Sequence, residues 1–127
     1  PGIYALNGAD ENSLCLTTVD FALTYFVVSG ELERSGVPCN LIISDAGGLS
    51  VLTAWAAGKL SSTSVSKFIQ ETVEPKIKCR KLIIPGKVAV LKGDIEAKLP
   101  GWEVIVAPLE AVQLVKFMKD LQANGEL

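Results

Sequence analysis

Histidine is absent from the 127 residues of this chain. Its absence excludes mechanisms in which a histidine activates a serine or cysteine, and any metal site built on imidazole from this chain. The three cysteines, Cys15, Cys39 and Cys79, stand alone, and no C-x-x-C pair predicts a zinc or iron–sulfur site. Single cysteines among apolar neighbours are typical of a reducing compartment, so we expect a cytoplasmic protein.

Basic runs and long apolar runs are also missing. The formal net charge is −2 and no lysine or arginine cluster stands out, so we expect no nucleic-acid binding. No apolar run approaches the roughly 20 residues of a transmembrane helix, and we expect no membrane association. The chain begins at Pro1 with no methionine and no export signal, and we expect a piece of a longer protein.

Predicted strands and helices alternate along the chain. Short apolar runs predict strands at residues 14–17, 40–44, 82–84 and 102–106. Apolar residues at helical spacing predict helices at about 20–34, 62–75, 88–99 and 110–122. Residues 1–13 are polar and rich in turn-forming residues, which predicts a loop. The alternation indicates an α/β fold: a Rossmann-like three-layer domain with a mainly parallel sheet of about four to five strands.

The first and last helices are predicted to bury different shares of their surface. Phe26 and Val27 widen the apolar stripe of the first helix, so we expect it to be covered on more than one side. In the last helix, the inward residues are predicted to be Val112, Val115, Met118 and Leu121.

Charged residues are missing between Asp45 and Lys59, and we expect this stretch to organise the domain. It leaves an apolar strand, turns on Gly47 and Gly48, and enters a short helix. A surface helix normally has one charged face. This uncharged helix must therefore lie against the core of the protein, another subunit or a large flat ligand.

Parallel sheets bind ligands beyond the carboxyl ends of their strands. The loops at that edge are predicted to be residues 17–20, 45–50, 85–88 and 107–109. Thr17 and Thr18 end the first strand, where they either bind a ligand or satisfy backbone groups in a turn. Tyr25 fits the helical stripe of core residues better than a ligand contact.

Two glycine motifs for phosphate binding fail. Gly58-Lys59 resembles the end of a phosphate-binding loop, but Thr53 occupies the required glycine position and Leu60 the hydroxyl position. No G-x-G-x-x-G follows the strand before Gly47. No nucleophile–base pair stands out either. Glycines, hydroxyls and an apolar helix indicate a site for a large, mostly apolar cofactor that brings its own chemistry.

Four separated segments, within the stretch from Tyr4 to Val106, occur in the same order in one known family. They are residues 21–26, 50–59, 80–86 and 99–104. Together they resemble the C-terminal domain of the large subunit of the corrinoid iron–sulfur protein. This subunit is also called the gamma subunit of the acetyl-CoA decarbonylase/synthase complex. Residues 107–111 depart from the family pattern, where Gly-Pro is expected.

The resemblance implies that residues 1–127 bind a cobalamin-type corrinoid. The cobalt would carry a methyl group between a methyltetrahydropterin methyltransferase and acetyl-CoA synthase, in the reductive acetyl-CoA pathway. In the family an iron–sulfur domain and a barrel precede this domain, so the iron–sulfur cluster is expected elsewhere in a longer parent chain. Implied partners are the small subunit of the corrinoid protein, the methyltransferase, acetyl-CoA synthase and a reductive activator protein. The domain alone is not expected to be a complete enzyme.

The residues expected to contact the corrinoid lie in the edge loops and in the two helices that follow them. They are Thr18, Tyr25, Gly47, Gly48, Leu49, Ser50, Val51, Leu52, Thr53, Pro85, Gly86, Val88, Ala107 and Pro108. The resemblance places Thr53 near the cobalt. The chain has no histidine to ligate the metal, and a hydroxyl would at most hold a water there, which leaves cobalt weakly ligated and easier to reduce.

Two other functions stay open. The chain is alternatively a Rossmann-like subunit-interaction module without its own cofactor, and its departure from the family pattern after Val106 favours that function. A nucleotide-binding regulatory domain is the other alternative, which the failed glycine motifs disfavour.

Overall fold

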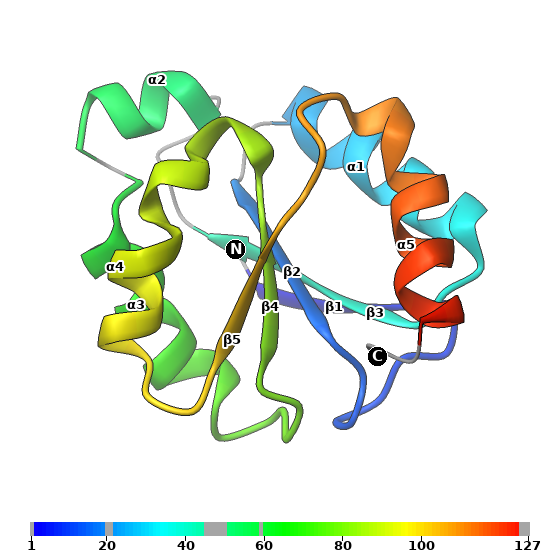
Figure 1. The fold of residues 1–127 in the computed structure, drawn as a ribbon, viewed down its shortest axis with the longest axis horizontal. Coiled ribbons are helices and arrows are strands. Elements are labelled where there is room, and N and C mark those ends of the chain that lie inside the picture. Colours follow the sequence, from blue (N-terminus) through cyan, green and yellow to red (C-terminus); the bar gives the residue numbers. More distant parts are fainter. Residues whose placement is uncertain (1, 20–21, 45–50, 59, 125–127) are drawn as a thin grey trace.

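The chain folds into three layers, with a sheet between two layers of helices (Figure 1). The computed structural model describes residues 2–19, 22–44, 51–58 and 60–124. Helices α1 and α5 cover one face of the sheet, and α3 and α4 cover the other. The elements are β1 (Gly2–Leu6), β2 (Cys15–Val19), α1 (Ala22–Ser35), β3 (Cys39–Ser44), α2 (Val51–Ala56), α3 (Ser62–Phe68), the π-helix η1 (Ile69–Val73), β4 (Lys81–Ile84), the 3₁₀-helix η2 (Gly86–Leu91), α4 (Lys92–Lys98), β5 (Glu103–Val106), the 3₁₀-helix η3 (Ala111–Gln113) and α5 (Leu114–Ala123).

The sheet has five strands in the order β1-β3-β2-β4-β5. Strand β2 pairs in parallel with β3 on one side and with β4 on the other, and β5 pairs in parallel with β4. The chain therefore leaves β2 toward one edge of the sheet and later returns past it to build the other edge. The predicted α/β fold with a mainly parallel sheet of four to five strands is confirmed.

The prediction of a loop over residues 1–13 is wrong for its first part. Residues Gly2–Leu6 form β1, an antiparallel edge strand in which Ile3 lies opposite Ile42. Ile3 packs against the core on one face of the sheet and Leu6 against the core on the other. An edge strand needs only one hydrogen-bonded neighbour, so a short segment beside a turn is sufficient.

Each face of the sheet has its own apolar core, because the central strands are apolar on both sides. Ile42 and Leu82 face the α3–α4 layer, where Ile69, Ile95 and Leu99 are buried. The neighbouring residues Leu41, Ile43 and Ile83 face the α1–α5 layer with Leu32 and Met118. The continuous apolar runs that predicted these strands therefore serve two cores.

Several residues predicted to be buried are exposed. Phe26 is 68% exposed and Val27 41% on α1, and Val112 is 71% exposed in η3. The apolar stripe of α1 is wider than the side of the helix that contacts the sheet and α5, and no third layer of described residues covers the remainder. The predicted burial of Met118 and Leu121 is confirmed, and Val115 is half-buried.

Three predicted helices are divided into two parts each. The helix predicted at 62–75 changes from α3 to the π-helix η1, and the one predicted at 88–99 begins as η2 before α4. Val88 interrupts η2 with φ −118° and ψ 32°. The helix predicted at 110–122 likewise begins as η3. None of the helices in the described part of the chain combines the length and apolar character needed to cross a membrane.

We expect Leu82→Ala to destabilise the domain by about 2–5 kcal/mol, because Leu82 is fully buried and truncation leaves a cavity. Leu109 is 64% exposed, and Leu109→Ala is the matched control with a change below about 0.5 kcal/mol. Urea unfolding followed by circular dichroism measures both. Equal effects of the two substitutions would contradict the assignment of Leu82 to the core.

Candidate functional site

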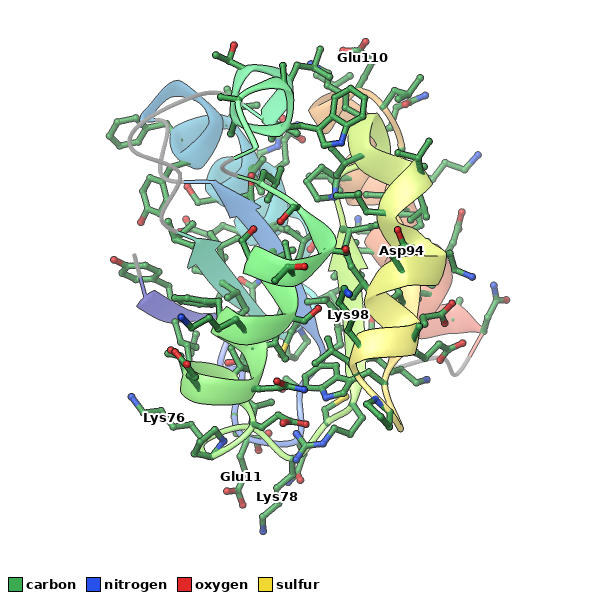
Figure 2. The ribbon with its side chains drawn as sticks, turned by 90° about the vertical axis from the view of Figure 1, so that its left-hand side faces the viewer. Glu11, Lys76, Lys78, Asp94, Lys98 and Glu110 are labelled. Carbon is green, nitrogen blue, oxygen red and sulfur yellow. The ribbon has the colours of Figure 1, made fainter. Side chains whose placement is uncertain are left out.

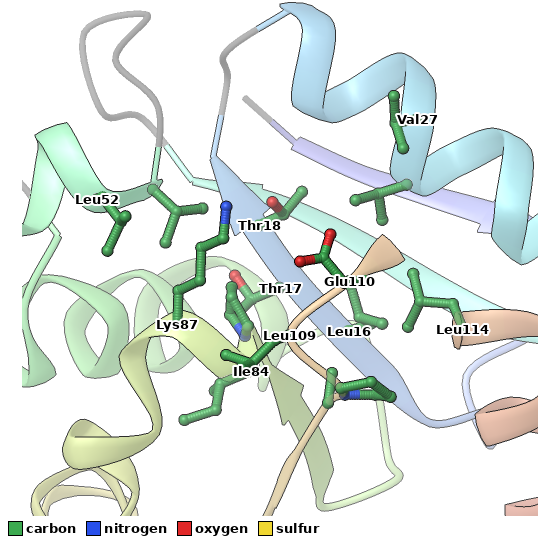
Figure 3. Close-up of a pocket in the computed structure, with 16 residues that line it drawn as sticks. Leu16, Thr17, Thr18, Val27, Leu52, Ile84, Lys87, Leu109, Glu110 and Leu114 are labelled. Carbon is green, nitrogen blue, oxygen red and sulfur yellow. The ribbon is translucent and has the colours of Figure 1, made fainter. Parts of the chain in front are cut away.

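A pocket opens at the carboxyl ends of β2, β4 and β5 (Figure 3). Its cavity volume is about 490 Å³. The pocket lies where the connections from β2 and β4 leave toward opposite edges of the sheet, and such a divergence opens a crevice in parallel α/β folds. The lining residues are Leu16, Thr17, Thr18, Val27, Val28, Val51, Leu52, Ile84, Pro85, Gly86, Lys87, Ala107, Pro108, Leu109, Glu110 and Leu114.

One wall of the pocket depends on the absence of a side chain at Gly86. A Cβ at this position would lie 2.5 Å from the carbonyl oxygen of Ala107 and 3.0 Å from that of Pro108. The loop after β4 therefore touches the loop after β5 through backbone atoms. The Ala107 amide continues this contact by donating a hydrogen bond to the carbonyl of Ile84 at 3.0 Å.

The two threonines at the end of β2 differ in their hydrogen bonding. Thr17 Oγ1 lies 3.4 Å from the carbonyl oxygen of Ile42 and donates to it. Thr18 is only 3% exposed, and its hydroxyl has no hydrogen-bond partner within the described part of the chain. Thr17 therefore satisfies the backbone, which was one of its two expected roles, whereas the hydroxyl of Thr18 is available to a ligand in the pocket.

Two charged side chains lie at the mouth of the pocket. Lys87 follows β4 directly after Gly86, and Glu110 follows β5, and Figure 3 shows both side chains over the cavity. Both are exposed. We did not predict them from the sequence, because charged loop residues usually only interact with solvent. The available signal was their position, because Lys87 lies within the predicted loop 85–88 and Glu110 directly follows the predicted loop 107–109.

Helix α2 packs on the core along one side only. Val51 and Ala54 are buried, whereas Leu52 is 49% and Trp55 44% exposed, and Thr53 is also exposed. Leu52 lines the pocket (Figure 3). The core accounts for one side of this uncharged helix, so another subunit or a ligand remains the explanation for the other side.

Half of the predicted contact residues line this pocket: Thr18, Val51, Leu52, Pro85, Gly86, Ala107 and Pro108. Three do not. Val88 is buried in the core beneath the pocket, and Thr53 lies on the exposed side of α2. The ring of Tyr25 stacks edge-on between Tyr4 and Phe26, with centroid distances of 5.9 and 5.5 Å. Gly47, Gly48, Leu49 and Ser50 lie outside the described residues.

The described residues offer no metal centre. No three histidine, cysteine, aspartate or glutamate side chains among them come close enough to hold an ion. Burial raises the pKa of the Cys15 thiol to about 12, and the nearby Cys79 contributes to the rise. Burial also raises the pKa of Cys39. These two thiols therefore stay protonated at neutral pH and act as apolar core residues.

The end of the molecule opposite the pocket is held by charged contacts (Figure 2). Lys78 Nζ and the Glu11 carboxylate form an ion pair of 3.1 Å at the end far from Glu110. Glu74 and Arg80, which are close to Lys78 in the chain, both contact Trp102. The Trp102 Nε1 donates a hydrogen bond to the Glu74 carboxylate at 2.9 Å, and the Arg80 guanidinium lies 5.2 Å from the centroid of the Trp102 ring. By contrast, the α2 side of the pocket presents exposed apolar side chains.

Residues 1–118 match the protein family described as CO dehydrogenase/acetyl-CoA synthase delta subunit. The chain belongs to this family. The acetyl-CoA decarbonylase/synthase complex subunit gamma of Methanopyrus kandleri is 40% identical over 120 residues, which cover 94% of this chain and 26% of that protein. The corrinoid/iron-sulfur protein large subunit of Moorella thermoacetica is 44% identical over 115 residues, or 90% of this chain and 26% of that protein. The chain thus spans about a quarter of the length of these relatives.

We expect Gly86→Ala to disturb the pocket, because the added methyl group would meet backbone atoms of the neighbouring loop rather than a flexible side chain. The expected loss of stability is about 1–3 kcal/mol. A methyl group added at Gly93 in α4 would meet no atom within 4 Å, so Gly93→Ala is the matched control. It should be neutral or stabilise by up to about 1 kcal/mol, as alanine favours helices. Urea unfolding of both variants measures the difference, and equal stability of the two would contradict the close contact.

Proposed function

We propose that this chain binds a cobalamin-type corrinoid at the carboxyl edge of its sheet and carries a methyl group on cobalt. The donor would be a methyltetrahydropterin methyltransferase and the acceptor acetyl-CoA synthase. The observation that carries the proposal is the uncharged α2, which leaves Leu52, Thr53 and Trp55 exposed beside the pocket. The name of the Moorella thermoacetica relative, a corrinoid/iron-sulfur protein large subunit, supports the choice of cofactor.

The residues present fit such a cofactor. A cobalamin-type corrinoid is larger than the cavity of about 490 Å³, so only a part of it would enter the pocket. Leu52 and Thr53, exposed on α2, would contact the flat ring. Pro85 and Gly86 line the pocket and would meet the cofactor from the loop after β4.

A bound corrinoid supplies a cobalt centre that accepts and donates a methyl group. The chain would hold the corrinoid in position and would offer the cobalt only a weak ligand. Val51 and Ala54 are buried and hold α2 against the core, which fixes the side of the helix that carries Thr53. The Thr53 hydroxyl would hold at most a water toward the metal, and no imidazole of this chain can replace that water.

A partner subunit would complete the site. Large apolar side chains are exposed on the elements around the pocket: Phe26 and Val27 on α1, Trp55 on α2, and Leu109 and Val112 after β5. Exposed apolar groups in such numbers are typical of a surface that another protein covers. We propose that the small subunit of the corrinoid protein covers this rim, and that the methyltransferase, acetyl-CoA synthase and a reductive activator protein reach the cofactor in turn.

The same rim would also serve an interaction module without a cofactor, the second candidate. The two functions differ in one respect. A cofactor-free module needs only the apolar rim, whereas a corrinoid-binding domain also needs the pocket. Binding of a corrinoid therefore distinguishes them.

We expect hydroxocobalamin to bind to the chain and the visible spectrum of the corrinoid to change on binding. In the Thr53→His variant, we expect the bound corrinoid to show the spectrum of a nitrogen-ligated cobalt and to be harder to reduce. Thr63→His is the matched control, because Thr63 is exposed on α3 away from the pocket. Spectroelectrochemistry of the three proteins measures both properties. A Thr53→His spectrum identical to that of the unmodified chain would contradict the position of Thr53, and the absence of binding would favour the interaction module.

A further inference from the structure

The two edge strands of the sheet, β1 and β5, differ in how their outer backbone is protected. Strand β5 has four residues, and its first residue, Glu103, is charged and exposed. The Val104 amide donates a hydrogen bond to the Glu96 carboxylate of α4 at 3.3 Å, and Lys92 pairs with the same carboxylate at 3.8 Å. Edge charges and side-chain caps of this kind keep an edge strand from pairing with another chain.

Strand β1, at the other edge, has none of these devices. Its five residues, Gly2–Leu6, include no charged residue and no proline. Strand β3 pairs with it on one side, whereas within the described part of the chain no strand and no side-chain cap covers the other side. Because the N–H and C=O groups of a strand point alternately to its two sides, the outer side of β1 offers free donors and acceptors to a further strand.

The middle residue of β1 is a half-exposed aromatic residue. Tyr4 is 43% exposed, and its ring meets that of Tyr25 in an edge-on arrangement at a centroid distance of 5.9 Å. Leu6 packs against the core on the α1–α5 face, and side chains alternate along a strand, so Tyr4 lies on that same face. An aromatic residue in this position gains most from a second aromatic residue directly opposite on a neighbouring strand.

We propose that β1 pairs with β1 of a second copy of this chain, antiparallel and about a two-fold axis, so that one sheet continues through both copies. A two-fold axis perpendicular to a strand places the identical strand antiparallel beside it, and the free donors of each strand then meet the acceptors of the other. The strand is uncharged, so no like charges meet, and Tyr4 at its centre lies opposite its own counterpart.

The second edge cannot serve in the same way. Pairing of β5 with a copy of itself would bring the Glu103 carboxylates to the interface and would require Val104 to leave its bond to Glu96. The β1 interface is also separate from the proposed function, because no residue of β1 lines the pocket.

Analytical ultracentrifugation of the full chain in a dilution series tests the proposal. The mass of one chain is 13.5 kDa, and we expect the average mass to rise toward twice that value with increasing concentration. Hydrogen–deuterium exchange at the same concentrations should show slower exchange in β1 at high concentration and unchanged exchange in β5. A single mass of 13.5 kDa at every concentration would overturn the proposal.

Opposite charges at Tyr4 show whether the two copies meet there. Tyr4→Lys and Tyr4→Glu should each weaken self-association about tenfold, because each places like charges directly opposite one another. An equal mixture of the two variants should restore association, since opposite charges then face each other. Val90→Lys is the matched control, because Val90 is 74% exposed in η2, outside β1, and this change should leave the mass unchanged.

The remaining outcomes each overturn the β1 interface and leave corrinoid binding untouched. Dimers that neither charge at Tyr4 weakens would place the contact on another surface. Association that is lost in both variants and not restored by mixing would show that the two Tyr4 residues do not face each other. If the variants fail to fold, as seen by circular dichroism, the concentration dependence of exchange in β1 of the unmodified chain decides.

Discussion

The parallel pairing of β2 with both β3 and β4 is the constraint on which the rest of this structure depends. The connection that leaves β2 runs toward β3 on one side, whereas the connection that leaves β4 runs toward β5 on the other side. These connections therefore diverge at the carboxyl ends of β2 and β4. The end of β2 carries Thr17 and Thr18, and the pocket lies above them. The walls follow from the same arrangement: the loop after β4 and the loop after β5 run side by side and touch at Gly86 and Ala107.

Most of this architecture could be predicted from the sequence, because its strongest signals are burial signals. The apolar runs at 41–43 and 82–84 predicted strands, and residues of both runs are buried in the two cores of the sheet. The parallel topology then placed the loops that follow the strands at one edge. For this reason several residues that are far apart in the sequence were predicted at one site and do lie around one pocket: Thr18, Pro85, Gly86, Ala107 and Pro108.

The failures have a common physical origin, since residue type does not show what covers a surface. Strand β1 was missed because an edge strand needs only a single neighbour and little apolar sequence. Phe26 and Val112 were predicted inside because apolar residues look alike in sequence whether the fold buries them or leaves them exposed. Lys87 and Glu110 were missed for the opposite reason, because charged loop residues look solvated whether or not they face a ligand. The folded chain brings both side chains to the mouth of one pocket.

In the function proposed here, α2 and the loops after β4 and β5 together form the cofactor-binding surface. Hydrogen–deuterium exchange of the chain with and without hydroxocobalamin examines that surface directly. We predict slower exchange of backbone amides in α2, at Gly86 and Lys87 and at residues 109–110 when the corrinoid is present, with unchanged exchange around Lys78 and Trp102 at the opposite end. Protection confined to that opposite end, or no protection of α2 at saturating corrinoid, would contradict the proposal.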